Sequence, residues 1–254
     1  MEYPFDALHA GIESQILNLP AGIPDSQAIR QAKSLPDSVE KFRALGKALS
    51  RQLRYREAVA AYTEGLNLEP ENLSLLRLRA GRYLTTLQSD PAIADFEKCL
   101  TLGAEKLDCL YRIGLAQYYA GRYEQAMEAF EGCMPLCDDE MGIAVLYWHT
   151  LSAVRTEKAP TLLKYDRPDM AVGHHTAYEK AMQVWSGTTP LAAALEMLES
   201  EEDDLEYGIT LYGLLWHPDC TEKECLSQSL LRRDGFWPSF AYIAAWKDWD
   251  GLRK

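Results

Sequence analysis

The first half of the chain repeats the same kinds of residue at a fixed step of 34 residues. Four columns keep this register over three cycles: Gly46, Ala80 and Gly114; Ala58, Ala92 and Ala126; Tyr62, Phe96 and Phe130; and Gly65, Cys99 and Cys133. Small residues let two antiparallel helices approach closely, and the aromatic column fills the space between one helix pair and the next. Each cycle is therefore predicted to be a helical hairpin. Because one hairpin cannot bury its apolar face alone, the hairpins should stack into a solenoid with a concave inner wall.

This pattern resembles the tetratricopeptide repeat (TPR). The first unit, residues 39–72, matches nearly every position of that motif, with Phe42, Leu45, Gly46, Leu49, Ala58, Tyr62 and Pro70. The second unit, residues 73–106, has Ala104 where the closing proline belongs, and the third, residues 107–140, has Gln117 at an aromatic position. The resemblance implies an all-α fold, a TPR-type solenoid of helical hairpins.

Residues 1–36 are predicted to form an N-terminal capping helix and a linker. Apolar residues recur at helical spacing from residue 5 to residue 18, and a segment containing proline and glycine follows them. Asp37, with Glu40 three residues later, is typical of a capping box at the start of a helix. The three TPR units are therefore expected to occupy residues 37–140.

Residues 141–254 are predicted to be a helical region of degenerate repeats. The register fails here, because Pro160 stands where the repeat expects alanine and Lys164 where it expects an aromatic residue. Helices are expected near 174–186, 190–200, 203–216, 221–233 and 238–249. Through the stretches AYEKAMQVWSGTTPLAAALEML and YGITLYGLLW, this half is weakly similar to the part that follows the repeats in NlpI-like TPR lipoproteins. The similarity implies an adaptor capable of self-association, without the lipidation cysteine of those proteins near the start.

Composition excludes several classes of partner. An apolar content of 47% is enough for a continuous core, while the net charge of −12 opposes capture of nucleic acid phosphates and of anionic lipid. No window approaches the roughly 20 apolar residues that a bilayer span needs. The six cysteines lack the paired spacing of a disulfide framework, which favours a reducing compartment. We therefore expect a cytoplasmic protein that binds neither nucleic acid nor membrane.

The inward positions of the repeat frame carry basic and aromatic residues. In TPR proteins the first helix of each unit lines the concave wall, so the residues expected to bind a peptide are Arg43, Lys47, Arg51, Arg77, Tyr111, Arg112, Tyr118 and Tyr119. Residues 30–82 hold 11 lysines and arginines against 6 acids, a net of +5 in a chain whose total is −12. This asymmetry predicts that the ligand is a protein or peptide segment with acidic or C-terminal carboxylate groups. A solvated basic face that balances nearby acids is the alternative.

The basic wall partly resembles the carboxylate clamp of chaperone-binding TPR domains. In that family, basic and amide residues hold the C-terminal carboxylate of an extended peptide. This sequence departs from the pattern at three positions, because asparagines are expected where Lys47 and Leu78 stand and a lysine where Asp108 stands. The resemblance therefore implies peptide binding without implying a chaperone tail as the ligand.

Two other functions stay open. No nucleophile elbow, phosphate-cradling glycine loop or HExxH helix occurs in the sequence, so we expect a binding module that needs no cofactor and is not an enzyme. The first alternative is a metal-dependent or catalytic protein built on His149, His174, His175 and Glu179, since His175 and Glu179 are one helical turn apart. The second is a homodimeric structural scaffold, to which the aromatic C-terminal segment would contribute.

Overall fold

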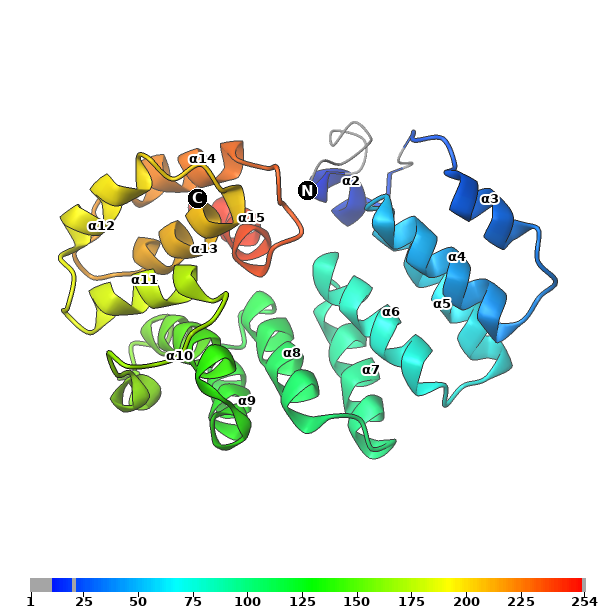
Figure 1. Ribbon diagram of the computed structural model, residues 1–254, viewed down its shortest axis with the longest axis horizontal. Helices are drawn as coiled ribbons and strands as arrows, with labels where there is room; N and C mark the ends of the chain where they lie inside the picture. The colour runs from blue at the N-terminus through cyan, green and yellow to red at the C-terminus, as the bar shows by residue number, and fades with distance from the viewer. Residues whose placement is uncertain (1–10, 20–21, 253–254) are drawn as a thin grey trace. The chain divides into compact units, whose positions relative to one another are not determined.

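The computed structural model of the protein describes residues 11–19 and 22–252. It divides into two compact units, Met1–Ala116 and Gln117–Lys254, and we describe each by itself. Every regular element in the described residues is helical, which confirms the all-α fold class (Figure 1). The boundary between the units falls inside helix α8 (Lys106–Tyr119), the first helix of the third repeat.

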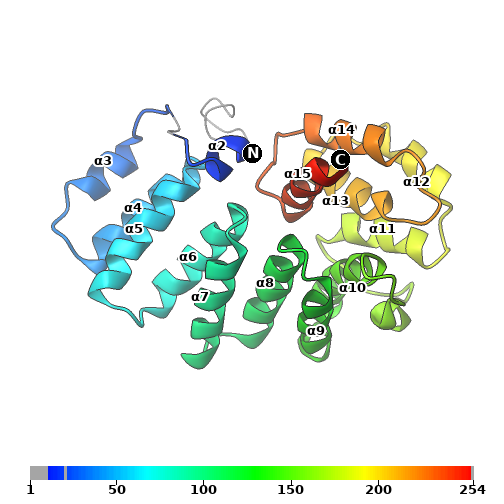
Figure 2. The ribbon, with the colours of Figure 1, turned by 180° about the vertical axis from the view of Figure 1, so that it is seen from behind.

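Unit 1 contains two complete helical hairpins. Its helices before α8 are α2 (Ile12–Ile16), α3 (Gln27–Lys33), α4 (Val39–Arg51), α5 (Tyr55–Leu68), α6 (Leu73–Thr85) and α7 (Ser89–Thr101). Helix α4 packs against α5, α5 against α6 and α6 against α7, so α4–α5 and α6–α7 are successive antiparallel pairs, seen from two sides in Figures 1 and 2. Helix α3 packs on α4. Of the predicted capping helix, residues 5–10 lie outside the described residues.

The repeat columns form the contacts between these helices. Ala58, Ala92 and Phe96 are completely buried, and Tyr62 is 1% exposed. Gly46 is required by the aromatic column, because a Cβ atom added there would lie only 2.2 Å from Cε1 of Tyr62. The 34-residue period therefore records where one helix must be thin and where its neighbour fills the space.

The turns inside the hairpins repeat with the same step. Leu53, Leu87 and Gly121 adopt left-handed φ angles of 57°, 55° and 76°. The residue after each one donates its amide N–H to the carbonyl five residues earlier, over 2.9 to 3.1 Å, as in a Schellman helix end. Glu157 continues the series with a φ of 56° and the same hydrogen bond, 36 residues after Gly121. A fourth hairpin turn therefore exists, displaced by two residues from the period, which is one reason the sequence register fails.

Unit 2 begins with the end of α8 and contains seven further α-helices and two short 3-10 helices within the described residues. They are α9 (Tyr123–Cys133), η1 (Met134–Leu136), α10 (Asp139–Val154), η2 (Thr161–Tyr165), α11 (Thr176–Trp185), α12 (Leu191–Leu198), α13 (Asp204–Leu215), α14 (Lys223–Arg232) and α15 (Phe240–Leu252). The five helices predicted after residue 170 agree with α11 to α15 within three residues at each end. The fourth hairpin has only the short helix η2 after its turn.

Helix α13 is the centre of unit 2. It packs against α11, α12, α14 and α15 (Figure 2), and residues 207–215 of this helix are all buried. Helix α10 is likewise buried on every side over residues 142–153. A helix that is apolar around its whole circumference belongs in a protein core, so the C-terminal helices close over α10 and α13 rather than forming a free tail.

The capping-box prediction is wrong by one residue. Ser38, not Asp37, is the N-cap of α4, since its hydroxyl accepts a 3.2 Å hydrogen bond from the amide of Lys41. Asp37 instead pairs with the ammonium group of Lys41 at 2.7 Å. Both residue types suit an N-cap, and the extended backbone at Ser38 decides between them.

Candidate functional site

An open groove of about 730 Å³ lies on the first helices of the repeats in unit 1. Its lining residues are Lys47, Ser50 and Arg51 of α4, Tyr62 of α5, Leu73, Ser74, Arg77, Leu78, Gly81 and Arg82 of α6, and Arg112 of α8. Five of these eleven residues are lysine or arginine and none is acidic. We call this feature the basic groove, and it stands out in a chain whose net charge is −12.

Helical periodicity explains why α6 contributes most of the lining. Ser74, Arg77, Leu78, Gly81 and Arg82 follow the spacing i, i+3, i+4, i+7 and i+8, which places them on one face of the helix. The residues of α4 follow the same rule at i, i+3 and i+4. The groove is therefore built from matching faces of consecutive first helices.

Arginines on other faces of α6 serve the fold instead. The guanidinium of Arg79 makes two hydrogen bonds to the carboxylate of Asp95, at 2.7 and 2.8 Å. The two side chains are only 18% and 10% exposed, so this pair ties α6 to α7 inside the second repeat. Arg79 is accordingly absent from the groove lining, although its sequence neighbour Leu78 belongs to it.

One side of the basic groove already has an acidic partner. Arg77 and Arg112 both bind the carboxylate of Asp108, at 2.8 and 2.9 Å. Burial tends to raise the pKa of Asp108, but hydrogen bonds and charges from the two arginines hold it below its ordinary value. Two positive charges here face one permanent negative charge.

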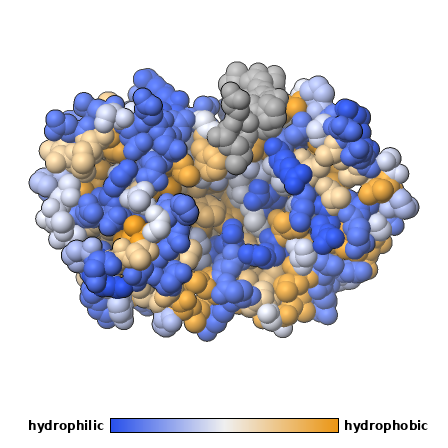
Figure 3. Space-filling view, in the orientation of Figure 1, coloured by the Kyte–Doolittle hydropathy of each residue, from blue (hydrophilic) through white to orange (hydrophobic). Residues whose placement is uncertain are grey.

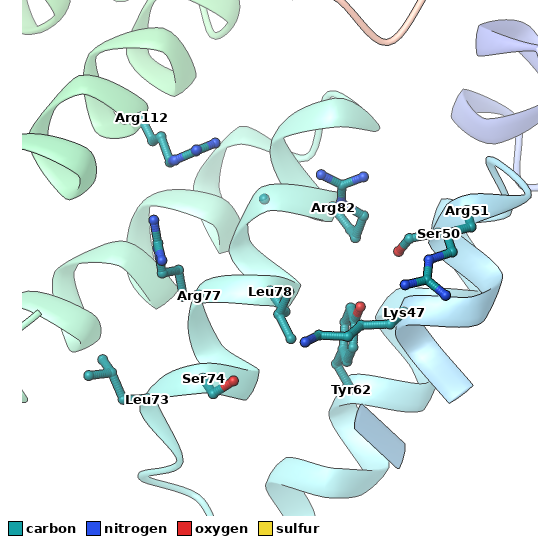
Figure 4. A pocket seen from close by; sticks show the side chains of 11 residues that line it. Lys47, Ser50, Arg51, Tyr62, Leu73, Ser74, Arg77, Leu78, Arg82 and Arg112 are labelled. Carbon is teal, nitrogen blue, oxygen red and sulfur yellow. The ribbon is translucent and has the colours of Figure 1, made fainter. Parts of the chain in front are cut away.

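The opposite side carries positive charge without a carboxylate. Figure 4 shows Lys47 and Arg51 on the side of the groove across from Arg77 and Arg112. Among the described residues, no acidic side chain forms an ion pair with Lys47, Arg51 or Arg82. In Figure 3, hydrophilic residues gather over α4 and α6, consistent with charged side chains that remain in water.

Two hydroxyl groups accompany these three cations. The guanidinium of Arg82 stacks on the ring of Tyr55 at 4.5 Å, which holds it beside the groove. Burial raises the pKa of the Tyr62 hydroxyl, and the nearby Ser50 hydroxyl and Arg82 charge oppose that rise. The Ser50 oxygen is buried and has no hydrogen-bond partner of good geometry among the described residues. We call Lys47, Ser50, Arg51, Tyr62 and Arg82 the α4 cluster.

The groove brings together four of the eight residues predicted to bind a peptide. Lys47, Arg51, Arg77 and Arg112 all line it. Arg43 is half-buried on α4 and does not belong to the lining. Sequence reasoning missed Arg82, which lies five residues after Arg77 and would have been found by following the same helix face for one further turn.

The tyrosine part of the predicted site is corrected by the structure. Tyr111, Tyr118 and Tyr119 are 7%, 1% and 3% exposed, so their rings offer almost no contact area to a ligand. In unit 2, the hydroxyl of Tyr118 is 2.7 Å from that of Tyr212, and Tyr119 donates to the carbonyl of Phe240 at 2.9 Å. These tyrosines are therefore used in packing and internal hydrogen bonds, and they are not accessible to a ligand.

The histidines of the second half contact neighbouring helices of unit 2. Within the part of the chain that the structure describes, no three His, Cys, Asp or Glu side chains lie close enough to hold a metal ion. Nδ1 of His175 contacts the carbonyl oxygen of Glu140, and the amide of His174 donates to the carboxylate of that same residue. His149 is completely buried, and burial lowers its pKa although Glu131 lies nearby. These contacts connect α10 to the start of α11 and to α9.

None of the helices in the described residues has the length and apolarity required to cross a membrane.

A family model of the tetratricopeptide repeat matches residues 107–136. This match lies in the third predicted unit and covers its first helix and the helix that follows.

Several curated proteins are similar to part of the chain. Small glutamine-rich tetratricopeptide repeat-containing protein 2 of Saccharomyces cerevisiae is 24% identical over 50% of this chain and 40% of its own length. The heat-shock protein cognate co-chaperone sgt12 of Aspergillus fumigatus is 28% identical over 42% of this chain and 31% of its own. The Hsp70-Hsp90 organizing protein of Triticum aestivum is 27% identical over 38% of this chain and 16% of its own.

The chain thus spans less than half the length of each of these relatives. The family match, the similar proteins and the recurring helical hairpins with their 34-residue turn spacing all identify the same architecture. The chain is a tetratricopeptide repeat protein.

Proposed function

We propose that this protein is an adaptor that binds an acidic segment of another protein in the basic groove. The observation that carries the proposal is the composition of the groove: five lysine or arginine residues on three consecutive first helices, with no acid in the lining. A site whose only charged side chains are cations favours ligands with carboxylate or phosphate groups. The negative charge of the rest of the chain repels acidic ligands elsewhere and so favours this surface.

The relatives support a role in protein interaction. Two of them have names that describe a co-chaperone and an Hsp70-Hsp90 organizing protein. For this chain a chaperone tail is a weaker candidate than an internal acidic segment, because Asp108 already pairs with two of the arginines that would bind a terminal carboxylate. We also propose that the protein acts in the cytoplasm, as the sequence predicts.

A charge reversal in the groove tests the proposal. Lys47→Glu is expected to abolish the capture of acidic partners, whereas Lys106→Glu is the matched control. Both lysines are exposed residues of unit 1, and both changes take the net charge from −12 to −14, but Lys106 does not line the groove. Affinity purification with the wild-type protein and both variants, followed by mass spectrometry, would identify proteins lost only with Lys47→Glu.

Blocking the groove without adding charge gives a second test. A Cβ atom added at Gly81 would meet no other atom within 4 Å, so the fold has room for a side chain there. Gly81→Leu should therefore weaken binding of the recovered partner by about tenfold or more, a ratio that corresponds to about 1.4 kcal/mol. If both Lys47→Glu and Gly81→Leu bind that partner as tightly as the wild type, the groove is not the binding site.

A further inference from the structure

The charges of the basic groove are divided unequally between its two sides. Arg77 and Arg112 share the carboxylate of Asp108, which leaves one uncompensated positive charge there. Lys47, Arg51 and Arg82 have no carboxylate partner among the described residues, which leaves three. An incoming anion is therefore attracted mainly to the α4 cluster.

The chemistry of the α4 cluster distinguishes between two kinds of anion. A carboxylate has two oxygen atoms and one negative charge, whereas a phosphate monoester has three free oxygens and a charge of about −1.5 to −2 at pH 7. The cluster offers an ammonium and two guanidinium groups, and the hydroxyls of Ser50 and Tyr62 lie at its inner edge, as Figure 4 shows. Three cations with several donors match the phosphate better in both charge and number of acceptors.

The hydroxyl of Ser50 is a second observation, since its oxygen is buried and meets the Tyr62 hydroxyl without good hydrogen-bond geometry. Figure 4 shows this oxygen directed toward the interior of the groove. A buried hydroxyl whose hydrogen bond is poorly formed costs free energy, and a ligand oxygen that reaches it recovers part of that cost. A phosphate group held between Lys47 and Arg82 would place acceptor oxygens on this side of the groove.

We propose, building on the acidic-segment adaptor above, that the α4 cluster is a subsite for a phosphorylated side chain of a partner protein. The apolar residues Leu73 and Leu78 also line the groove, which suits the chain on either side of a phosphorylated residue. A phosphorylated lipid is disfavoured as the source, because a protein with a net charge of −12 is repelled by an anionic bilayer. Asp108 neutralises one of the two arginine charges on the other side of the groove, which makes that side less attractive to a second anion.

Three matched peptides test this subsite by fluorescence anisotropy with the full chain. The probe is fluorescein-Gly-Asp-Leu-X-Leu-Asp-Gly, in which X is phosphoserine, glutamate or serine. We expect the phosphoserine peptide to bind about tenfold more tightly than the glutamate peptide, and the glutamate peptide more tightly than the serine peptide. Affinity for the phosphoserine peptide should also rise severalfold from pH 5.5 to pH 7, because the second ionisation of phosphate lies near pH 6.

The pH response separates phosphate from carboxylate. Lysine, arginine and tyrosine side chains ordinarily titrate near or above pH 10 and aspartate near pH 4. The lining contains no histidine, and the arginines lower the pKa of Asp108 further. The glutamate peptide should therefore bind almost equally at pH 5.5 and pH 7, with only the phosphoserine peptide responding.

Variants locate the preference within the groove. Arg82→Gln, and separately Lys47→Gln with Arg51→Gln, should reduce the tenfold preference for phosphoserine to threefold or less. Lys106→Gln, which removes a charge outside the groove, should leave the preference unchanged. Asp108→Asn should tighten both acidic peptides together and leave their ratio as it was. Circular dichroism checks the fold of each variant, and because Lys47 and Arg51 are exposed, their double variant remains informative if Arg82→Gln misfolds.

The outcomes separate this inference from the function on which it rests. Equal affinity for phosphoserine and glutamate peptides, both tighter than serine, would overturn the phosphate subsite and leave the acidic-segment adaptor standing. A preference that survives the Lys47 and Arg51 double variant would overturn it too. Equal binding of all three peptides would remove both proposals. Vesicles containing phosphatidylinositol phosphate that compete as well as the phosphoserine peptide would assign the phosphate to a lipid and reject the protein ligand.

Discussion

Replacing one glycine of the repeat column should show how strictly the hairpin geometry is specified. In Gly46→Ala the new Cβ atom would lie 2.2 Å from Cε1 and 2.6 Å from Cδ1 of Tyr62. Carbon atoms in contact are normally about 3.5 to 4.0 Å apart, so the ring would have to move by more than about 1 Å. Tyr62 is 1% exposed, so a shift of its ring would disturb the side chains packed around it.

The magnitude follows from two opposing terms. Overpacking a core costs about 1–3 kcal/mol, and the size of this overlap places Gly46→Ala near the upper end. Alanine gains about 1 kcal/mol over glycine in a helix interior. We therefore expect Gly46→Ala to lower the free energy of unfolding by about 2 kcal/mol. Gly81→Ala, in the next first helix, should raise it by about 0.5–1 kcal/mol, because its Cβ atom meets nothing within 4 Å.

Urea unfolding followed by circular dichroism would measure both variants under the same conditions. The clash with Tyr62 is tested further by the double variant Gly46→Ala with Tyr62→Leu, whose destabilisation should be smaller than the sum of the two single changes. A Gly46→Ala protein that is as stable as the wild type would refute the explanation of the glycine column. Strict additivity in the double variant would show that the loss arises elsewhere.

Three further perturbations test the fold. Glu157→Gly should stabilise the protein by about 0.5–1 kcal/mol, because glycine adopts the left-handed φ of this exposed turn without strain. The control Glu128→Gly, in the exposed middle of α9, should cost about 1 kcal/mol. Similar urea midpoints for the two variants would contradict this explanation. Arg79→Ala should lower the free energy of unfolding by about 2–3 kcal/mol, because it leaves the carboxylate of Asp95 unpaired. This is less than the loss expected for a fully buried pair, since the Asp95 side chain is 10% exposed. A loss below about 0.5 kcal/mol in the same assay would be inconsistent with a buried ion pair. Burial raises the pKa of Tyr242 to about 12, so the stability that its neutral hydroxyl contributes is complete below pH 10 and is lost as the pH rises toward 12. The free energy of unfolding of Tyr242→Phe should therefore fall less steeply than that of the wild type between pH 10 and pH 12. Identical pH curves for the two proteins would argue against this assignment.

Local sequence patterns determined most of the secondary structure. The 34-residue columns predict the hairpins because each column marks a contact that every repeat must make, as the complete burial of Ala58 and Ala92 shows. Helical periodicity also located Lys47, Arg51, Arg77 and Arg112 on the first helices, where they line one groove. These features depend on neighbours within one or two repeats.

Other features depended on packing that no local pattern records. Tyr118 satisfies the inward frame of the repeat, yet it is buried beside Tyr212, which lies 94 residues away in the sequence. The displaced turn at Glu157 breaks the sequence register while preserving the hairpin geometry.

The groove combines both kinds of information. Residue type and spacing alone predicted a basic wall, but only the folded structure placed Asp108 between Arg77 and Arg112, 31 and 4 residues away from them. The charge available to a ligand depends on which cations already have partners, and pairing across neighbouring helices is set by side-chain distances of a few ångströms. The sequence therefore determined that the wall is positive, and the tertiary structure decided where on that wall the positive charge remains free.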